Sequence, residues 1–93
     1  MGLVFEWDAE KAETNRRKHG VGFAEATTVF HDTFSSTISD PDHSSPSEDR
    51  ELTIGLFHRQ RLIVVAHCKR GTNIRIINAR PATRRERKEY EEG

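Results

Sequence analysis

The stretch Leu62-Ile63-Val64-Val65-Ala66 decides the fold. A continuously apolar run of this length is typical of a central strand that is covered on both faces. On its N-terminal side, residues 52–56 carry apolar side chains at alternate positions, which predicts an amphipathic strand. On its C-terminal side, the isoleucines within residues 74–77 predict a further strand. The middle of the chain is therefore expected to form a β-sheet.

The connections between these strands are short. Residues 59–61 join the first pair, and residues 69–72, which contain Gly71, join the second. Short loops between consecutive strands predict an antiparallel meander. Residues 35–39 predict its first strand, and residues 40–50, rich in Asp, Ser and Pro, predict an exposed loop.

Three helices are predicted outside the meander. A short apolar strand is predicted at residues 3–7. The first helix follows it, with Asp8 as its N-cap and Gly20 just past its end. The residues of this helix are polar nearly all round. Residues 23–30 carry an apolar stripe at helical spacing, and the Thr-x-x-Glu pattern of residues 83–86 is a capping box that opens a last helix. The order β-α-α-β-β-β-β-α predicts an α+β domain: a small antiparallel β-sheet with two N-terminal helices and one C-terminal helix on one side of it.

Length and composition limit the class of protein. With 93 residues the chain is expected to form one domain, residues 1–93. The single cysteine, Cys68, excludes an internal disulfide and suits a reducing cytoplasm. The sequence contains no run of 18 apolar residues and no apolar core of a signal peptide, so we expect a cytoplasmic protein without a membrane partner.

The charge is balanced overall but unevenly distributed. The formal net charge is zero, yet the segment from Arg59 to Lys88 contains ten basic residues and a single acid, Glu86. An uneven field of this kind attracts polyanions or an acidic partner protein. The basic third of the chain is therefore the first place to look for function.

The start of the last helix is the strongest anomaly in this segment. Arg84 and Arg85 occupy its first turn, where the helix dipole is positive and a cation is unfavourable. Free backbone N–H groups and guanidinium groups together suit a phosphate. Arg80 ends the strand just before, and Arg75 lies five residues upstream on that strand. We expect the four arginines to converge on a phosphate, although each one alone fits a solvated basic face.

Four other side chains have a structural and a functional interpretation. His19 follows several cations at a helix C-terminus, a stabilising arrangement, but a histidine also transfers protons near neutral pH. Trp7 and Lys11 at the start of that helix suit a stacked base and a phosphate, and Trp7 equally suits the core. Tyr90 is the only large apolar group on the last helix, so a role in docking that helix is favoured over contact of its hydroxyl with a substrate. For Glu86, the capping role is favoured over that of a general base.

A metal site or a cofactor is not predicted. Asp40, Asp42 and His43 cluster, but in a loop rich in Ser and Pro. His67 and Cys68 are adjacent on a strand, so they point to opposite faces and cannot share one ion. No pair of residues has the spacing of zinc ligands.

Several blocks of the sequence form a distinctive pattern. The N-terminal blocks are Phe5-Glu6-Trp7-Asp8, Lys11, Asn15, Lys18-His19-Gly20-Val21 and Phe23-x-Glu25-Ala26-x-x-Val29-Phe30; the C-terminal block is Ile74-Arg75-Ile76-Ile77-x-Ala79-Arg80-x-Ala82-x-x-x-Glu86-Arg87-x-x-Tyr90. Together these blocks resemble the BrnT family of toxins. The similarity covers nearly the whole chain, including Asp-Pro-Asp-His at residues 40–43. One departure is Gly22, where a Ser- or Asp-like cap is expected.

The resemblance implies a RelE/ParE-like toxin of a type II toxin–antitoxin system. It implies a metal-independent endoribonuclease that inhibits translation, and a small BrnA-like antitoxin that forms a heterotetramer with the toxin and alone contacts DNA. Trp7, Lys11, His19, Arg75 and Arg80 are the implied RNA-site positions. We expect Arg75, Arg80, His19 and Lys11 to be catalytic, and Trp7, Arg84, Arg85 and Tyr90 to bind RNA. The general base and acid stay open among His19, Lys11 and Tyr90.

Two other functions fit the same residues. The domain could bind RNA without cutting it, or it could be an inactive toxin remnant whose basic face only holds an acidic antitoxin. RNA integrity after expression separates the enzyme from both.

Overall fold

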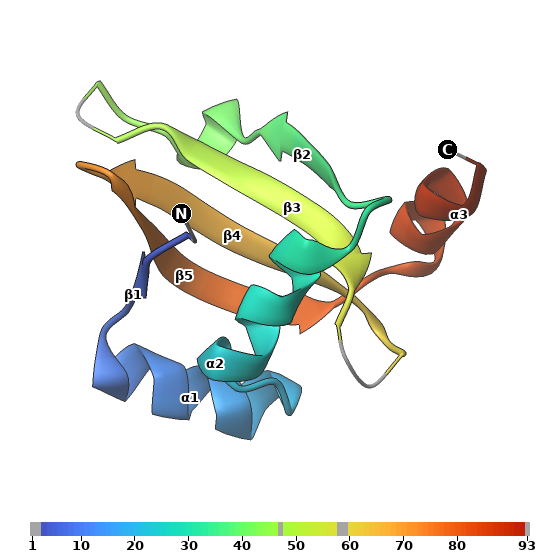
Figure 1. Cartoon of the computed structure of the whole chain (residues 1–93), viewed down its shortest axis with the longest axis horizontal. Coiled ribbons are helices and arrows are strands. Elements are labelled where there is room, and N and C mark those ends of the chain that lie inside the picture. The colour runs from blue at the N-terminus through green and yellow to red at the C-terminus, as the bar shows by residue number, and fades with distance from the viewer. Residues whose placement is uncertain (1–2, 47, 58–59, 93) are drawn as a thin grey trace.

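The predicted meander forms the centre of a five-stranded sheet. The computed structural model describes residues 3–46, 48–57 and 60–92. Its strands are β1 (Phe5–Glu6), β2 (Ser36–Ser39), β3 (Arg50–Leu56), β4 (Leu62–Arg70) and β5 (Asn73–Pro81), and their order across the sheet is β1-β5-β4-β3-β2. Strands β2 to β5 each pair antiparallel with their neighbour in sequence, which confirms the meander and the α+β class (Figure 1).

The first strand does not follow the antiparallel pattern. β1 pairs in parallel with β5, with Phe5 opposite Ile74 and Glu6 opposite Arg75. No hairpin joins these two strands, so no tight turn forces them to run antiparallel. The sheet is therefore mixed, and β1 pairs only with Ile74 and Arg75, near the start of β5.

The first helix begins and ends where the sequence predicts. Helix α1 (Ala9–His19) starts after Asp8, whose Oδ1 accepts the backbone N–H groups of Glu10 and Lys11 at 2.8 and 3.2 Å. It ends at Gly20, which adopts the left-handed conformation with φ of 72°. This helix of 11 residues is the longest described, and within the described residues none is long and apolar enough to cross a membrane.

The second helix is shorter than predicted. Helix α2 (Phe23–Ala26) continues as the 3₁₀ helix η1 (Thr27–His31). The hydroxyls of Thr27 and Thr28 donate to the carbonyls of Ala24 and Glu25, both at 2.7 Å, and such back-bonding competes with regular helix geometry. Gly22, which stands where the family resemblance leads us to expect a Ser- or Asp-like cap, has no side chain to cap the helix. Its N–H donates to Glu25 Oε1 at 3.4 Å.

One face of the sheet carries the hydrophobic core, and we call it the core face. Helix α2 lies over it (Figure 1), and Val21, Phe23, Ala26 and Val29 belong to the core cluster. From the sheet they meet Ile63, Val65, Ile76 and Ala79. Residues 62–68 of β4 are all buried, as expected for a central strand. We call the opposite face, which carries Leu52, Ile54, Val64 and Ala66, the open face.

A β-bulge determines which residues of β5 reach the open face. His67 is opposite Ile76 but Ala66 is opposite Asn78, so Ile77 is the extra residue. Paired residues project to the same face of a sheet. Arg75, Asn78 and Arg80 lie opposite Cys68, Ala66 and Val64, and therefore share the open face. Without the bulge, Arg75 and Arg80 would project to opposite faces because their spacing is odd.

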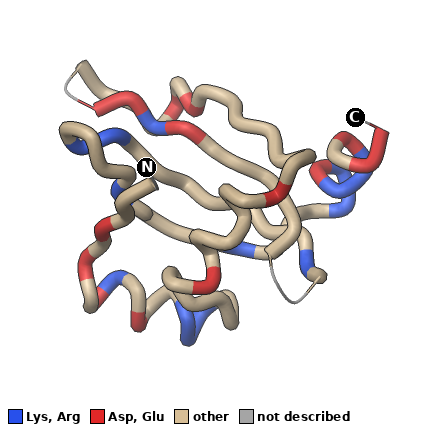
Figure 2. Tube along the Cα trace, in the orientation of Figure 1, with Lys and Arg blue, Asp and Glu red and all other residues tan. Residues whose placement is uncertain are grey.

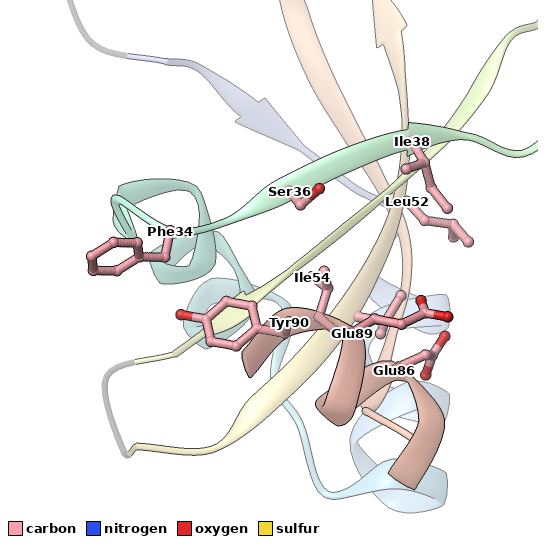
Figure 3. A pocket seen from close by; sticks show the side chains of 9 residues that line it. Phe34, Ser36, Ile38, Leu52, Ile54, Glu86, Glu89 and Tyr90 are labelled. Carbon is pink, nitrogen blue, oxygen red and sulfur yellow. The ribbon is translucent and has the colours of Figure 1, made fainter. Parts of the chain in front are cut away.

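The last helix lies on a different side of the sheet from the prediction. Helix α3 (Arg84–Glu92) was expected beside the other two helices, but its Glu86, Glu89 and Tyr90 line a groove with open-face residues (Figure 3). Its predicted capping box is confirmed: Glu86 N–H donates to Thr83 Oγ1 at 3.2 Å, and Thr83 N–H donates to Glu86 Oε1 at 2.9 Å. The groove-facing side chains, rather than an apolar stripe, fix its position.

A buried histidine lies at the centre of the core face. His67 is 4% exposed, its Nε2 is 2.7 Å from Thr53 Oγ1, and Thr53 Oγ1 is 2.7 Å from Thr37 Oγ1. The Phe30 ring meets the imidazole edge-on at 5.0 Å. Burial lowers the pKa of His67 below its ordinary value of 6.5, and the charge of Glu51 opposes this only in part. The neighbouring Cys68 points to the other face, as predicted, and is also buried.

This burial predicts that the domain loses stability as the pH falls through the ordinary histidine range. The unfolded chain takes up a proton at His67 first, so lowering the pH favours unfolding. Urea unfolding at about pH 7.5 and about pH 5 should show a lower free energy of unfolding at the acidic pH, part of which is attributable to this residue. His67→Gln keeps a hydrogen bond to Thr53 but cannot be protonated, so its loss should be smaller. Parallel pH profiles for both proteins would contradict the assignment.

Candidate active site

Helix α1 and strand β5 enclose a polar cleft at the sheet edge. Its volume is about 450 Å³, and it is lined by Glu10, Lys11, Thr14, Asn15, Lys18, His19, Ile77, Asn78 and Arg80. Three of the four predicted catalytic residues, Lys11, His19 and Arg80, thus meet in one cleft. Its charged lining comprises three cations and one carboxylate, a balance that favours an anionic ligand.

The position of α1 against the sheet depends on Asn15. Its Oδ1 accepts the Ala79 N–H at 3.0 Å, and its Nδ2 donates to the Ala79 carbonyl at 2.9 Å and to the Val21 carbonyl at 3.0 Å. Asn15 is 6% exposed and is the only described residue of α1 classed as buried. β1 does not pair with this part of β5. The Asn15 amide there provides the backbone of Ala79 with the donor and the acceptor that a neighbouring strand would otherwise provide. It also fixes the helix face that carries Lys11 and His19.

Arg80 is held by a carboxylate from the last helix. Its two terminal nitrogens donate to Glu86 Oε1 and Oε2 at 2.7 and 2.9 Å. The hydrogen bonds from Arg80 lower the pKa of Glu86 to about 2, and the Thr83 N–H contributes to this decrease. Burial of the carboxylate raises the pKa but only partly offsets these effects. Glu86 therefore stays ionised at neutral pH. It has the capping role predicted for it and, in addition, an ion pair that the sequence did not predict.

The four arginines do not converge on the start of α3. Arg75 lies near the start of α1 instead: the pKa of Asp8 there is lowered mainly by the Lys11 and Glu10 N–H groups and more weakly by the charges of Lys11 and Arg75. Arg84 and Arg85 are exposed, and Arg85 Nε is 3.5 Å from Glu89 Oε1. The expected single phosphate cluster is therefore wrong.

The basic third also does not form one continuous face. The basic residues at the end of β4 lie in the hairpin that leads to β5, whereas those of α3 lie at the far end of the sheet (Figure 2). Arg59, part of the same prediction, lies outside the described residues. The fold thus distributes the positive charge of the C-terminal third over several separate places.

The two aromatic residues predicted to bind RNA make defined contacts within the domain. Trp7 is 36% exposed, and its ring meets Phe23 edge-on at 6.1 Å, so it is partly core and partly surface. The Tyr90 hydroxyl donates to Asp32 Oδ2 at 2.6 Å, and this bond raises the pKa of Tyr90 to about 12. Asp32 also accepts the Leu56 N–H at 2.8 Å, so Tyr90 anchors α3 to the end of β3.

Some residues of the site were not predicted. Glu10, Thr14, Lys18 and Asn78 line the cleft, and Asp32 holds Tyr90. For Thr14 and Lys18 a signal existed, because they follow Lys11 at helical spacing on one face. For Asn78 and Asp32 none existed, since the bulge and the long-range contact that place them leave no local pattern. Among the described residues, no group of three or more His, Cys, Asp or Glu side chains is arranged to hold a metal ion.

A family model for the ribonuclease toxin BrnT of type II toxin–antitoxin systems matches residues 7–86. The chain belongs to the BrnT family. The crystal structure of the Brucella abortus ribonuclease toxin BrnT is similar to the whole fold: the TM-score is 0.65 and the identity 27%, over 89% of this chain and 100% of the other. A comparison with curated proteins gave no match. Membership of the BrnT family implies an RNA substrate and an antitoxin partner.

The Asn15 contacts predict a large loss of stability on truncation. Asn15→Ala leaves the Ala79 N–H and two carbonyls buried without partners, so the free energy of unfolding should fall by about 2–4 kcal/mol. Thr14→Ala, an exposed neighbour on the same helix, should change it by less than about 0.5 kcal/mol. Urea unfolding monitored by circular dichroism measures both. Equal effects of the two substitutions would show that the amide does not hold α1 on the sheet.

Proposed function

We propose that this protein is a metal-independent endoribonuclease toxin whose active site is the cleft between α1 and β5. The observation that supports it is the meeting of Lys11, His19 and Arg80 in one cleft of a BrnT-family domain. A proton-transferring imidazole, an ammonium and a guanidinium are the groups that RNA cleavage through the 2′-hydroxyl requires. The cations of the cleft supply the positive charge that a metal ion supplies in other nucleases.

In the proposed reaction, the 2′-hydroxyl oxygen attacks the adjacent phosphorus. The His19 imidazole takes the hydroxyl proton as the new P–O bond forms. The bond from phosphorus to the 5′-oxygen breaks, and the Lys11 ammonium donates its proton to that leaving oxygen. The products are a 2′,3′-cyclic phosphate and a 5′-hydroxyl. This reaction needs no oxidant and no second substrate.

Arg80 stabilises the negative charge that develops on the phosphate in the transition state. Glu86 holds its two terminal nitrogens from the α3 side, and the guanidinium retains further N–H donors that can reach the cleft. A fixed cation beside the phosphate stabilises the extra negative charge of the pentavalent transition state without having to reorient. The Glu86 carboxylate therefore orients Arg80 for this role.

The other predicted RNA contacts extend the path of the strand. Trp7 and Arg75 lie near the start of α1, where a base can stack on the exposed part of the indole and Arg75 can meet the backbone. Arg84 and Arg85, exposed on α3, suit more distant phosphates. Tyr90 can offer RNA its ring and its hydroxyl oxygen as an acceptor, because its hydroxyl proton is donated to Asp32.

In the cell, we propose that the protein cuts RNA in the cytoplasm and so inhibits translation. A BrnA-like antitoxin neutralises it in a heterotetramer, and only the antitoxin contacts DNA. The family match supports this proposal, since it describes a ribonuclease toxin of type II toxin–antitoxin systems.

The ribonuclease proposal predicts loss of activity without loss of fold. Purified protein should cleave labelled RNA in the presence of EDTA. His19→Gln, Lys11→Ala and Arg80→Ala should each reduce the rate by about 10²–10³-fold. Arg17→Ala is the matched control, because Arg17 is on the same helix but is 76% exposed and paired with Glu13. Cleavage that stops with EDTA and returns with a divalent cation would refute the metal-independent mechanism.

The toxin proposal predicts growth arrest on expression. Inducible expression of the chain alone should stop growth and degrade bulk RNA, and co-expression with the neighbouring antitoxin gene should restore both. His19→Gln should be harmless when expressed alone. RNA that is bound but stays intact would favour the binding module, and neither binding nor cleavage would favour the inactive remnant.

A further inference from the structure

The open face carries an apolar groove that the proposed reaction does not use. It has a volume of about 250 Å³ and is lined by Phe34, Ser36, Ile38, Leu52, Ile54, Val64, Glu86, Glu89 and Tyr90. Phe34 and Ile38 lie at opposite ends of it (Figure 3). They are 78% and 61% exposed, the two highest values among the large hydrophobic side chains that the structure describes. Exposed apolar groups gathered around a groove mark an interaction surface.

The edge of the sheet beside this groove is unprotected. β2 is the last strand in the sheet order, all four of its residues are exposed, and within the described residues only β3 pairs with it. Its sequence, Ser36-Thr37-Ile38-Ser39, contains no charge and no proline, the usual devices that prevent another strand from pairing with an edge. The free backbone N–H and C=O groups of β2 can accept a further strand.

We propose that this edge and groove bind an extended segment of the antitoxin, which adds to β2 as a sixth strand. This proposal rests on the proposed function in one respect: the partner is identified as an antitoxin because the protein is proposed to be a toxin. Ser36 and Ile38 project to the open face, as their opposite residues Ile54 and Leu52 do, whereas Thr37 and Ser39 project to the other face. The segment therefore alternates: apolar side chains lie against Ile38 and Phe34, and small or polar side chains lie beside Thr37 and Ser39.

The charge of the groove specifies one further feature of this segment. At the α3 side, Glu86 is neutralised by Arg80, but Glu89 is 70% exposed. Its only described ion pair is the 3.5 Å contact with Arg85, which is 90% exposed. Glu91 and Glu92 follow at the end of the helix. The binding segment thus carries a lysine or arginine where it meets α3. An acidic antitoxin segment, by contrast, suits the cationic cleft and not this groove.

The experiment measures binding of the purified antitoxin to the full-length toxin. To prevent toxicity, all toxins carry His19→Gln for the binding measurements. Ile38→Lys and Phe34→Ser should each weaken binding by at least about 10-fold, as loss of an apolar anchor does. Leu3→Ser is the matched control, because Leu3 is 55% exposed but lies before β1, at the other edge of the sheet, and binding should stay within about 2-fold.

Hydrogen exchange separates strand addition from other ways of binding. Antitoxin should protect the amides of residues 36–39 that are free in the uncomplexed toxin. Protection confined to α1 and β5, or unchanged affinity of the Ile38→Lys and Phe34→Ser variants, would overturn the proposal. Self-association of the toxin that Ile38→Lys abolishes, with antitoxin binding intact, would assign the edge to a second copy of the chain and would also overturn it.

The outcome is independent of the ribonuclease proposal. In the otherwise unmodified chain, Ile38→Lys and Phe34→Ser should leave RNA cleavage by free toxin within about 2-fold, because neither side chain lines the cleft. They should prevent the antitoxin from stopping that cleavage. A chain that cuts no RNA but binds antitoxin through β2 would refute the proposed function alone, and the reverse result would refute the docking surface alone.

Discussion

The arrangement of the cleft depends on which groups form hydrogen bonds with the backbone of β5 along the edge that no strand pairs with. β1 pairs with only the first part of that edge, and backbone groups further along would be buried without partners. Asn15 supplies both a donor and an acceptor to Ala79, and it also caps the Val21 carbonyl. Helix α1 has no apolar stripe to dock it, so this one amide does what a hydrophobic face does for α2. The helix can therefore present polar residues to the cleft along its whole length.

A second constraint connects the cleft to α3. The bulge at Ile77 turns Arg80 to the open face, where Glu86 meets it in a bidentate pair. Arg80 is 33% and Glu86 26% exposed, so the pair is only partly desolvated and its geometry matters more than its net contribution to stability. Because the pair and the Thr83 N–H lower the pKa of Glu86 to about 2, its carboxylate stays ionised at neutral pH. Arg80 is thus a cation whose orientation is set by Glu86.

Local sequence patterns predicted the local structure well. The run at residues 62–66, the Asp8 and Gly20 caps, and the capping box at residues 83–86 all act over a few residues, and all are confirmed. The misplaced features depend on distant contacts. The side of the sheet on which α3 lies follows from Tyr90 reaching Asp32, 58 positions away in sequence. The arginines were expected to converge because they are close in sequence, but a strand separates residues five apart by roughly 16 Å.

The same reasoning explains why the sequence predicted several residues of the cleft but not how they are arranged. Lys11 and His19 came from a helix face and from the family resemblance, and Arg80 from the end of a strand; each is locally visible in the sequence. That they face one another depends on Asn15 and on the bulge, which no periodicity reveals. The open-face groove and the cleft meet at the Arg80–Glu86 pair, since Arg80 lines one and Glu86 lines the other. A strand bound at β2 would thus contact the helix that orients Arg80, so that a partner could act on the cleft without entering it.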